Sequence, residues 1–169
     1  MSEKNIYVNN ADILSESEPI SNMPSELLGL FFFAYRDFVC DADALLATKN
    51  LGRAHHRVLY FVNIKQGMSV ATLLSILKIT KQSLARVLKE LIETGYIEQK
   101  TGKNDRRQRL LFATIKGQEL FKTLSHMQTE RIEAALAKQP KGTKKIVKQF
   151  FIDMVEQDEL EMLKKLKLS

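Results

Sequence analysis

The sequence predicts a mainly α-helical protein that carries one small β-hairpin. Apolar residues recur at helical spacing through most of the chain, which is typical of amphipathic helices packed on a core. One stretch near the middle, 101–108, holds glycine, asparagine and aspartate between two short runs of strand-forming residues. With 169 residues and 44% hydrophobic content, the chain is long enough for one compact domain, or one domain with an extension.

Composition excludes several classes of protein. The single cysteine, Cys40, rules out an intrachain disulfide and fits a reducing compartment. The N-terminus lacks the basic and then apolar order of a signal peptide. The longest apolar run, 27–35, is far shorter than the roughly 20 residues of a membrane-spanning helix. We therefore expect a soluble, cytoplasmic protein that does not enter a membrane.

The first quarter of the chain has two parts. Residues 1–22 are polar and weakly patterned, and they predict an N-terminal arm that is disordered or packed on a partner. Residues 23–52 hold a first long helix, opened by Pro24 and Ser25 and running to about Lys49. Its apolar residues, 27–35, occupy more than one face, so the helix is expected to be buried in a contact between subunits.

Three further helices precede the hairpin. The second covers about Arg53 to Lys65, and the third covers Val70 to Leu77 behind the capping residue Ser69. Thr80 caps the fourth, which begins at Lys81 and ends at Gly95, a residue suited to a left-handed helix end. Only a few residues join the third and fourth helices, which is the length of a helix-turn-helix connection.

The hairpin gives this region its likeness to a DNA-binding domain. Its strands are expected at Tyr96–Lys100 and Arg109–Ala113, and its loop ends in a basic tip at 103–107. Between residues 78 and 109, nine Lys and Arg oppose four Asp and Glu, a net +5 out of the chain's +6. A capped helix followed by a basic hairpin is typical of a winged helix-turn-helix, so residues 53–113 are predicted to bind nucleic acid.

The last part of the chain, 114–169, predicts two long amphipathic helices. The first starts at Thr114 and stops at Pro140, and the second runs from about Thr143 through Leu166. Together with the first helix they carry more apolar surface than one winged domain covers. The predicted fold class is therefore mainly α with a small β wing: a winged helix-turn-helix domain plus a helical dimerisation region.

The order of these elements, with a short strand before the helix-turn-helix, resembles the MarR family of transcriptional regulators over about residue 23 to the C-terminus. The resemblance implies an obligate homodimer, a wing braced by Asp105, and insertion of Arg107 into the minor groove of double-stranded DNA. The residues that carry it are Thr80-Lys81-Gln82-Ser83-Leu84-Ala85-Arg86, Leu91-Ile92-Glu93-Thr94-Gly95-Tyr96-Ile97, Asp105-Arg106-Arg107 and Thr114-Ile115-Lys116-Gly117.

Candidate DNA contacts lie on the fourth helix and the wing. Arg86 has the chemistry to read guanine and Gln82 to read adenine, since both pair with two hydrogen bonds in the major groove. The alternatives are a solvated helix face and a hairpin that only aids solubility. The full set of predicted contacts is Lys81, Gln82, Ser83, Arg86, Lys89, Lys103, Arg106, Arg107 and Arg109.

A small aromatic or weakly acidic effector is a further expectation of the resemblance, with Tyr35, His55, His56 and Tyr60 bordering its pocket. Adjacent histidines point in different directions on a helix, so they form no metal site. Cys40 as a redox sensor is an alternative, but the sensing branch of the family places its cysteine near the position of Leu30. A buried or half-buried thiol is therefore expected.

No phosphate-binding glycine cluster, HExxH motif or CxxC motif occurs, so neither an enzyme nor a cofactor is predicted. The sequence thus predicts a DNA-binding regulator, a repressor released by a small molecule, acting as a homodimer on a pseudo-palindromic operator. The second alternative is a winged-helix adaptor for protein interactions, which would lack the basic tip.

Overall fold

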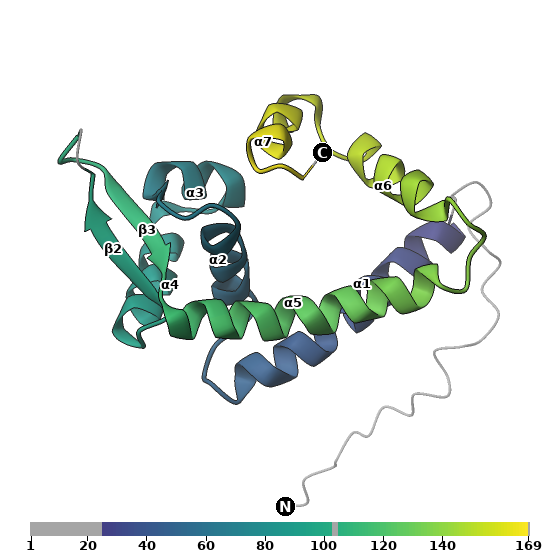
Figure 1. The fold of residues 1–169 in the computed structure, drawn as a ribbon, viewed down its shortest axis with the longest axis horizontal. Coiled ribbons are helices and arrows are strands. Elements are labelled where there is room, and N and C mark those ends of the chain that lie inside the picture. The colour runs from purple at the N-terminus through teal and green to yellow at the C-terminus, as the bar shows by residue number, and fades with distance from the viewer. Residues whose placement is uncertain (1–24, 103–104, 169) are drawn as a thin grey trace, which may run out of the picture. The chain divides into compact units, whose positions relative to one another are not determined.

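The computed structural model describes residues 25–102 and 105–168, which form helices and one small sheet (Figure 1). This confirms the predicted fold class, whereas the arm at 1–22 lies outside the described residues. The elements in order are α1 (Ser25–Ala47), α2 (Arg53–Ile64), β1 (Met68–Ser69), α3 (Val70–Leu77), α4 (Lys81–Glu93), β2 (Ile97–Thr101), β3 (Arg109–Ala113), α5 (Ile115–Leu136), α6 (Thr143–Asp153), the 3-10 turn η2 (Gln157–Glu159) and α7 (Leu160–Lys165).

Two compact units divide between Tyr35 and Arg36, inside α1, and each is described by itself. In the first, apolar side chains of α1 face solvent: Leu27 is 71% exposed, and Leu28, Leu30, Phe31 and Phe32 are also exposed. Across the described ranges, no helix has the length and apolarity to span a membrane.

The helix-turn-helix begins at the residues that the sequence indicates. The Ser69 hydroxyl accepts the N–H of Thr72 at 3.0 Å and starts α3. The Thr80 hydroxyl accepts the N–H of Ser83 at 3.1 Å and starts α4. Each cap satisfies one of the N–H groups that a helix start leaves unpaired, which explains why the boundaries are readable from the sequence.

The end of α4 shifts the first strand of the hairpin by one residue. Gly95 takes a left-handed conformation with φ of +75°, as predicted. The N–H of Tyr96 then bonds to the carbonyl of Leu91 at 2.8 Å, which closes the helix. Because Tyr96 belongs to this closure, β2 starts at Ile97 rather than at Tyr96.

The sheet is antiparallel, with the strand order β1-β3-β2. Leu111 pairs with Met68 on one side and with Gln99 on the other, so β3 is central. One face of the sheet packs against the core. Its buried side chains are those of Met68, Ile97, Leu111 and Ala113.

Helix α2 lies at the centre of the second unit and packs on α3, α4, α5 and β3. It also donates a hydrogen bond to the helix-turn-helix, because Nη2 of Arg57 lies 3.3 Å from the carbonyl oxygen of Leu77. The most fully buried side chains of the core are Leu46, Val58, Leu59, Val62, Leu73, Leu84, Leu91, Ile97, Leu111 and Leu124.

The prediction of one final helix through Leu166 is wrong. Helix α6 ends at Asp153, and the chain turns through η2 into the short α7. This break carries Leu166 into the core, where it is 7% exposed, and places Glu159 2.6 Å from the Lys78 ammonium. Burial of an apolar side chain therefore outweighs helical continuity here.

Helix α6 keeps an apolar surface of its own. Ile146 is 70% exposed, and Phe150, Phe151 and Met154 are more than half exposed. The rings of Phe150 and Phe151 pack edge to face with centroids 5.7 Å apart. Exposed aromatic side chains in such a group are typical of a contact with another chain.

Candidate nucleic-acid interface

Helix α4 has a buried back and an exposed, basic front. Leu84, Val87, Leu88 and Leu91 are buried at helical spacing. On the other side, the five predicted DNA contacts that lie on α4 are all exposed: Lys81, Gln82, Ser83, Arg86 and Lys89. The side chain of Arg86 is 81% exposed. The front thus offers cationic and hydrogen-bonding groups of the kind that contact phosphates and base edges.

Two ion pairs lie along this front at i, i+4 spacing. Nε of Arg86 lies 3.6 Å from Glu90, and Nζ of Lys89 lies 3.8 Å from Glu93. Exposed pairs of this kind contribute little to stability, and salt screens them. The two cations therefore remain available to a polyanion.

The carboxyl end of α4 is tied to the start of α5. The Thr114 hydroxyl donates to the carbonyl of Gly95 at 2.7 Å, and its oxygen accepts the N–H of Gly117 at 3.1 Å. Lys116 donates to the carbonyl of Thr94 at 2.7 Å, and its ammonium lies 4.3 Å from the centroid of the Tyr96 ring. These contacts fix the direction of α4 relative to α5.

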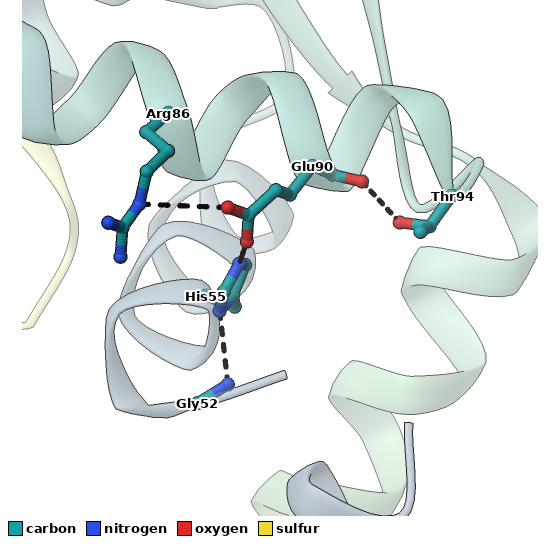
Figure 2. Close-up of polar contacts among 5 residues, drawn as sticks. All are labelled: Gly52, His55, Arg86, Glu90 and Thr94. Atoms are coloured by element: carbon teal, nitrogen blue, oxygen red, sulfur yellow. Dashed lines mark hydrogen bonds and ion pairs between the residues drawn. The ribbon is translucent and has the colours of Figure 1, made fainter. Parts of the chain in front are cut away.

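A polar connection also joins the last turn of α4 to the start of α2 (Figure 2). Nε2 of His55 lies 2.6 Å from Oε2 of Glu90, and Nδ1 of His55 accepts the N–H of Gly52 at 3.0 Å. His55 is 8% exposed and is the one buried polar or charged residue within 25–102 and 105–168. The structure therefore places this predicted pocket residue inside the domain, where both of its ring nitrogens are bonded.

Two hydrogen bonds hold the loop of the wing. Oδ1 of Asp105 accepts the N–H of Arg107 at 2.8 Å, a turn that a short acidic side chain favours. Nη1 of Arg109 donates to the Thr101 hydroxyl at 2.7 Å, across the hairpin. Arg106 and Arg107 are exposed at the tip, and Lys103 lies outside the described residues.

A groove of about 720 Å³ lies along α4, between α3 and the hairpin. Its floor is apolar, with Leu74 and Leu88 among its residues, and its rim carries the cations Lys81, Lys89 and Arg109. The combination of an apolar floor and a few charged groups is typical of sites for small organic ligands.

The other predicted pocket residues have surroundings of their own. The Tyr60 ring packs edge to face on Phe61 and Phe121, and burial raises the pKa of its hydroxyl. Burial lowers the pKa of the His56 ring, against a smaller opposing effect of Asp43. Tyr35 is exposed and belongs to the other unit.

The thiol of Cys40 is exposed, so the expectation of a buried or half-buried cysteine is wrong. The periodicity of α1 places Val39 and Ala42 inward, and Cys40 falls between them on the outer face. Over residues 25–102 and 105–168, no group of three or more His, Cys, Asp and Glu side chains is arranged to hold a metal ion.

Sequence reasoning missed Glu90 and the function of Thr114. Glu90 is the less exposed member of an ordinary i, i+4 pair with Arg86, and nothing in the sequence signals its bond to a residue 35 positions earlier. For Thr114, the capping pattern indicates a helix start, whereas its bond to Gly95 follows only from the tertiary fold.

Comparison with known proteins agrees with this geometry. Residues 49–108 match the model of the MarR family. The chain is also 48% identical over 104 residues to the HTH-type transcriptional regulator PetP of Rhodobacter capsulatus, covering 62% of this chain and 63% of PetP. Residues 49–108 are therefore similar to the MarR family, as the sequence predicts. MarR-family members are transcriptional regulators and not enzymes, which agrees with the predicted non-enzymatic class.

Solved structures of MarR-type proteins share the fold. A MarR protein from Peptoclostridium difficile superposes with a TM-score of 0.71 at 21% identity, covering 89% of this chain and 98% of that one. FabT of Streptococcus pneumoniae, solved in complex with DNA, gives a TM-score of 0.70 at 15% identity and covers 82% and 98%. The winged helix-turn-helix expected from the sequence is thus confirmed as a fold, and the match to PetP spans less than two thirds of that relative's length.

Proposed function

We propose that this protein is a sequence-specific, DNA-binding transcriptional regulator that acts as a homodimer. The observation that carries the proposal is the juxtaposition of an exposed basic helix front with a cationic hairpin. PetP is named as a transcriptional regulator and FabT is solved in complex with DNA, and both support the same function here. Because such a regulator works where the DNA is, we also propose a cytoplasmic location.

Helix α4 would enter the major groove and the wing would reach the adjacent minor groove. Arg86 and Gln82 have the donors to read base edges, whereas Lys81 and Lys89 suit phosphates. Arg106 and Arg107, at the exposed tip, carry the side chains that a narrow minor groove attracts. Asp105 supports this assignment, because its bond to the N–H of Arg107 shapes the tip.

The homodimer is supported by two exposed apolar surfaces, each considered by itself. One lies on the first part of α1, at Leu27, Leu28, Leu30, Phe31 and Phe32, and the other lies on α6. Monomeric soluble proteins rarely expose apolar patches of this kind, and a second copy of the chain would cover them. We retain 23–52 and 114–169 as the dimerisation segments and 53–113 as the DNA-binding domain.

The experiment measures the DNA affinity of two alanine variants by fluorescence anisotropy over a range of salt concentrations. Each variant is tested on a matched duplex, which carries the sequence that the unmodified protein prefers, and on a random duplex. Arg107→Ala should weaken binding to every duplex and lower the salt dependence by about one counterion per subunit. Arg86→Ala should cost about 1–3 kcal/mol per half-site and relax the preference at one base position. Equal losses on matched and random DNA for both variants would contradict these roles. Absence of duplex binding by the unmodified protein would favour an adaptor for protein interactions.

We further propose that the protein is a repressor released by a small aromatic or weakly acidic ligand. The groove beside α4 supports this, since an acid that filled its apolar floor would pair with Lys81, Lys89 or Arg109. These cations are also proposed to contact DNA, so the ligand would compete with the operator. His56 and Tyr60 remain candidates for a second position of the ligand.

Calorimetric titration of salicylate into free and operator-bound protein tests this response. A tenfold loss of DNA affinity corresponds to about 1.4 kcal/mol of coupling between the two ligands. By reciprocity, operator DNA must lower the affinity of the protein for the small molecule by the same factor. Identical ligand affinities in the two titrations, over a panel of aromatic acids, would refute release by such ligands. The response should persist in Cys40→Ser; its loss there would favour a redox sensor instead.

A further inference from the structure

Glu90 connects the exposed front of α4 to the interior of the domain. Its Oε2 lies 2.6 Å from Nε2 of His55, and its Oε1 lies 3.6 Å from Nε of Arg86. Figure 2 shows the Glu90 carboxylate between the two side chains, with one oxygen towards the His55 ring at the start of α2 and the other towards Arg86 on α4. We propose that His55 and Glu90 are positioning residues that set how Arg86 presents its guanidinium to a base. This inference rests on the proposed DNA-binding function.

The hydrogen bonds of His55 identify its tautomer. The N–H of Gly52 donates to Nδ1 at 3.0 Å, so Nδ1 carries a lone pair and not a proton. The ring proton is therefore on Nε2, which donates to the Glu90 carboxylate. With both nitrogens bonded and the residue 8% exposed, the imidazole has one orientation. Glu90 is consequently anchored by a group that is itself fixed.

Anchoring matters because Arg86 is otherwise a long, mobile side chain. Ordering such a side chain at an interface costs conformational entropy, and a partner that restricts it beforehand lowers this cost. Glu90 faces Nε of Arg86, and the two terminal nitrogens point away from the carboxylate (Figure 2). Those terminal nitrogens form the fork that donates to O6 and N7 of guanine.

The same helix offers a matched comparison. Lys89 and Glu93 form a second i, i+4 pair on α4, at 3.8 Å, and the Glu93 side chain is 63% exposed against 41% for Glu90. Glu93 lies at the solvent-facing end of the helix, whereas Glu90 reaches α2 through His55. Removing either carboxylate changes the charge of α4 equally, so only a positioning role separates the two.

The test is a double-mutant cycle on DNA preference. Glu90→Gln keeps an oxygen that accepts from His55 and removes the charge that attracts Arg86. The ratio of affinities for the preferred and random duplexes is measured at one salt concentration for the unmodified protein, Arg86→Ala, Glu90→Gln and the double variant. We expect Glu90→Gln to lower this ratio about three- to tenfold, part of the roughly 5- to 150-fold that a bidentate base contact provides. In the Arg86→Ala background, Glu90→Gln should change the ratio no further.

Each other outcome has a clear meaning. A ratio that is unchanged in Glu90→Gln, as expected for the control Glu93→Gln, overturns the inference and leaves the proposed function standing. An equal drop with and without Arg86 also overturns it, because that is the result of a merely structural role. If the unmodified protein prefers no duplex, the proposed function and this inference both fail. His55→Phe should repeat the loss of ratio, and an unchanged ratio in that variant overturns the part assigned to His55.

Discussion

The hydroxyl of Thr114 lies 2.7 Å from the carbonyl oxygen of Gly95, so one side chain both caps α5 and holds the end of α4. The same oxygen accepts the N–H of Gly117 at 3.1 Å. A change of direction in α5 would therefore be transmitted to the helix proposed to read DNA. Such a connection is one physical route by which events in the C-terminal helices reach the winged domain.

Thr114→Val should lower the free energy of unfolding by about 0.5–2 kcal/mol, the usual cost of losing an N-cap. Valine keeps the shape and removes the hydroxyl. Thr123→Val on the same helix is the control, because the Thr123 hydroxyl only bonds back to the carbonyl of Glu119 at 3.1 Å. Urea unfolding of both variants checks the difference, and equal losses would argue against the connection.

Gly117→Ala should destabilise the fold, because this position has no room for a side chain. A methyl group at this position would collide with the carbonyl oxygen of Tyr96, which is backbone and has little room to move. The same substitution at Gly29 meets no atom within 4 Å. Thermal unfolding should therefore show a clear loss for Gly117→Ala and none for Gly29→Ala. A Gly117→Ala variant as stable as the unmodified protein would contradict the close packing of α5 on Tyr96.

Phe150→Glu should dissociate the proposed dimer. The side chain is 55% exposed on α6, and burying a carboxylate in an apolar contact between subunits is costly. Lys148→Glu, on the same helix, also makes the chain more negative; it is the control and should leave the assembly intact. Sedimentation over a range of concentrations measures both, and an unmodified protein that stays monomeric would refute the dimer.

His56 should make the fold less stable in mild acid. Burial lowers the pKa of this ring in the folded state, with Asp43 opposing to a smaller degree, so the unfolded chain binds a proton more readily. Stability is then lost as the pH falls through the unfolded pKa of about 6.5. Melting temperatures between pH 8 and pH 5 should fall less in His56→Gln than in the unmodified protein. Parallel curves for the two proteins would show that His56 contributes nothing to the pH dependence of stability.

Local signals accounted for much of the fold. Ser69, Thr80 and Gly95 mark helix ends through bonds to residues only a few positions away, and these ends are confirmed. The break after Asp153 was not predictable, because it follows from the burial of Leu166 against residues far away in sequence. Helical spacing separates inner from outer positions on α4, which is why its exposed front was found. It carries no information on partners from other helices, which is why the bond between His55 and Glu90 was missed.

The central claim is that two copies of α4, related by a two-fold axis, read double-stranded DNA. Selection of bound sequences from a random duplex library, with the unmodified protein at physiological salt, tests it most directly. We predict enrichment of an inverted repeat whose half-sites are about one helical turn, or roughly 10 base pairs, apart from centre to centre. A bound pool with no enriched sequence, or with a single unrepeated half-site, would contradict it.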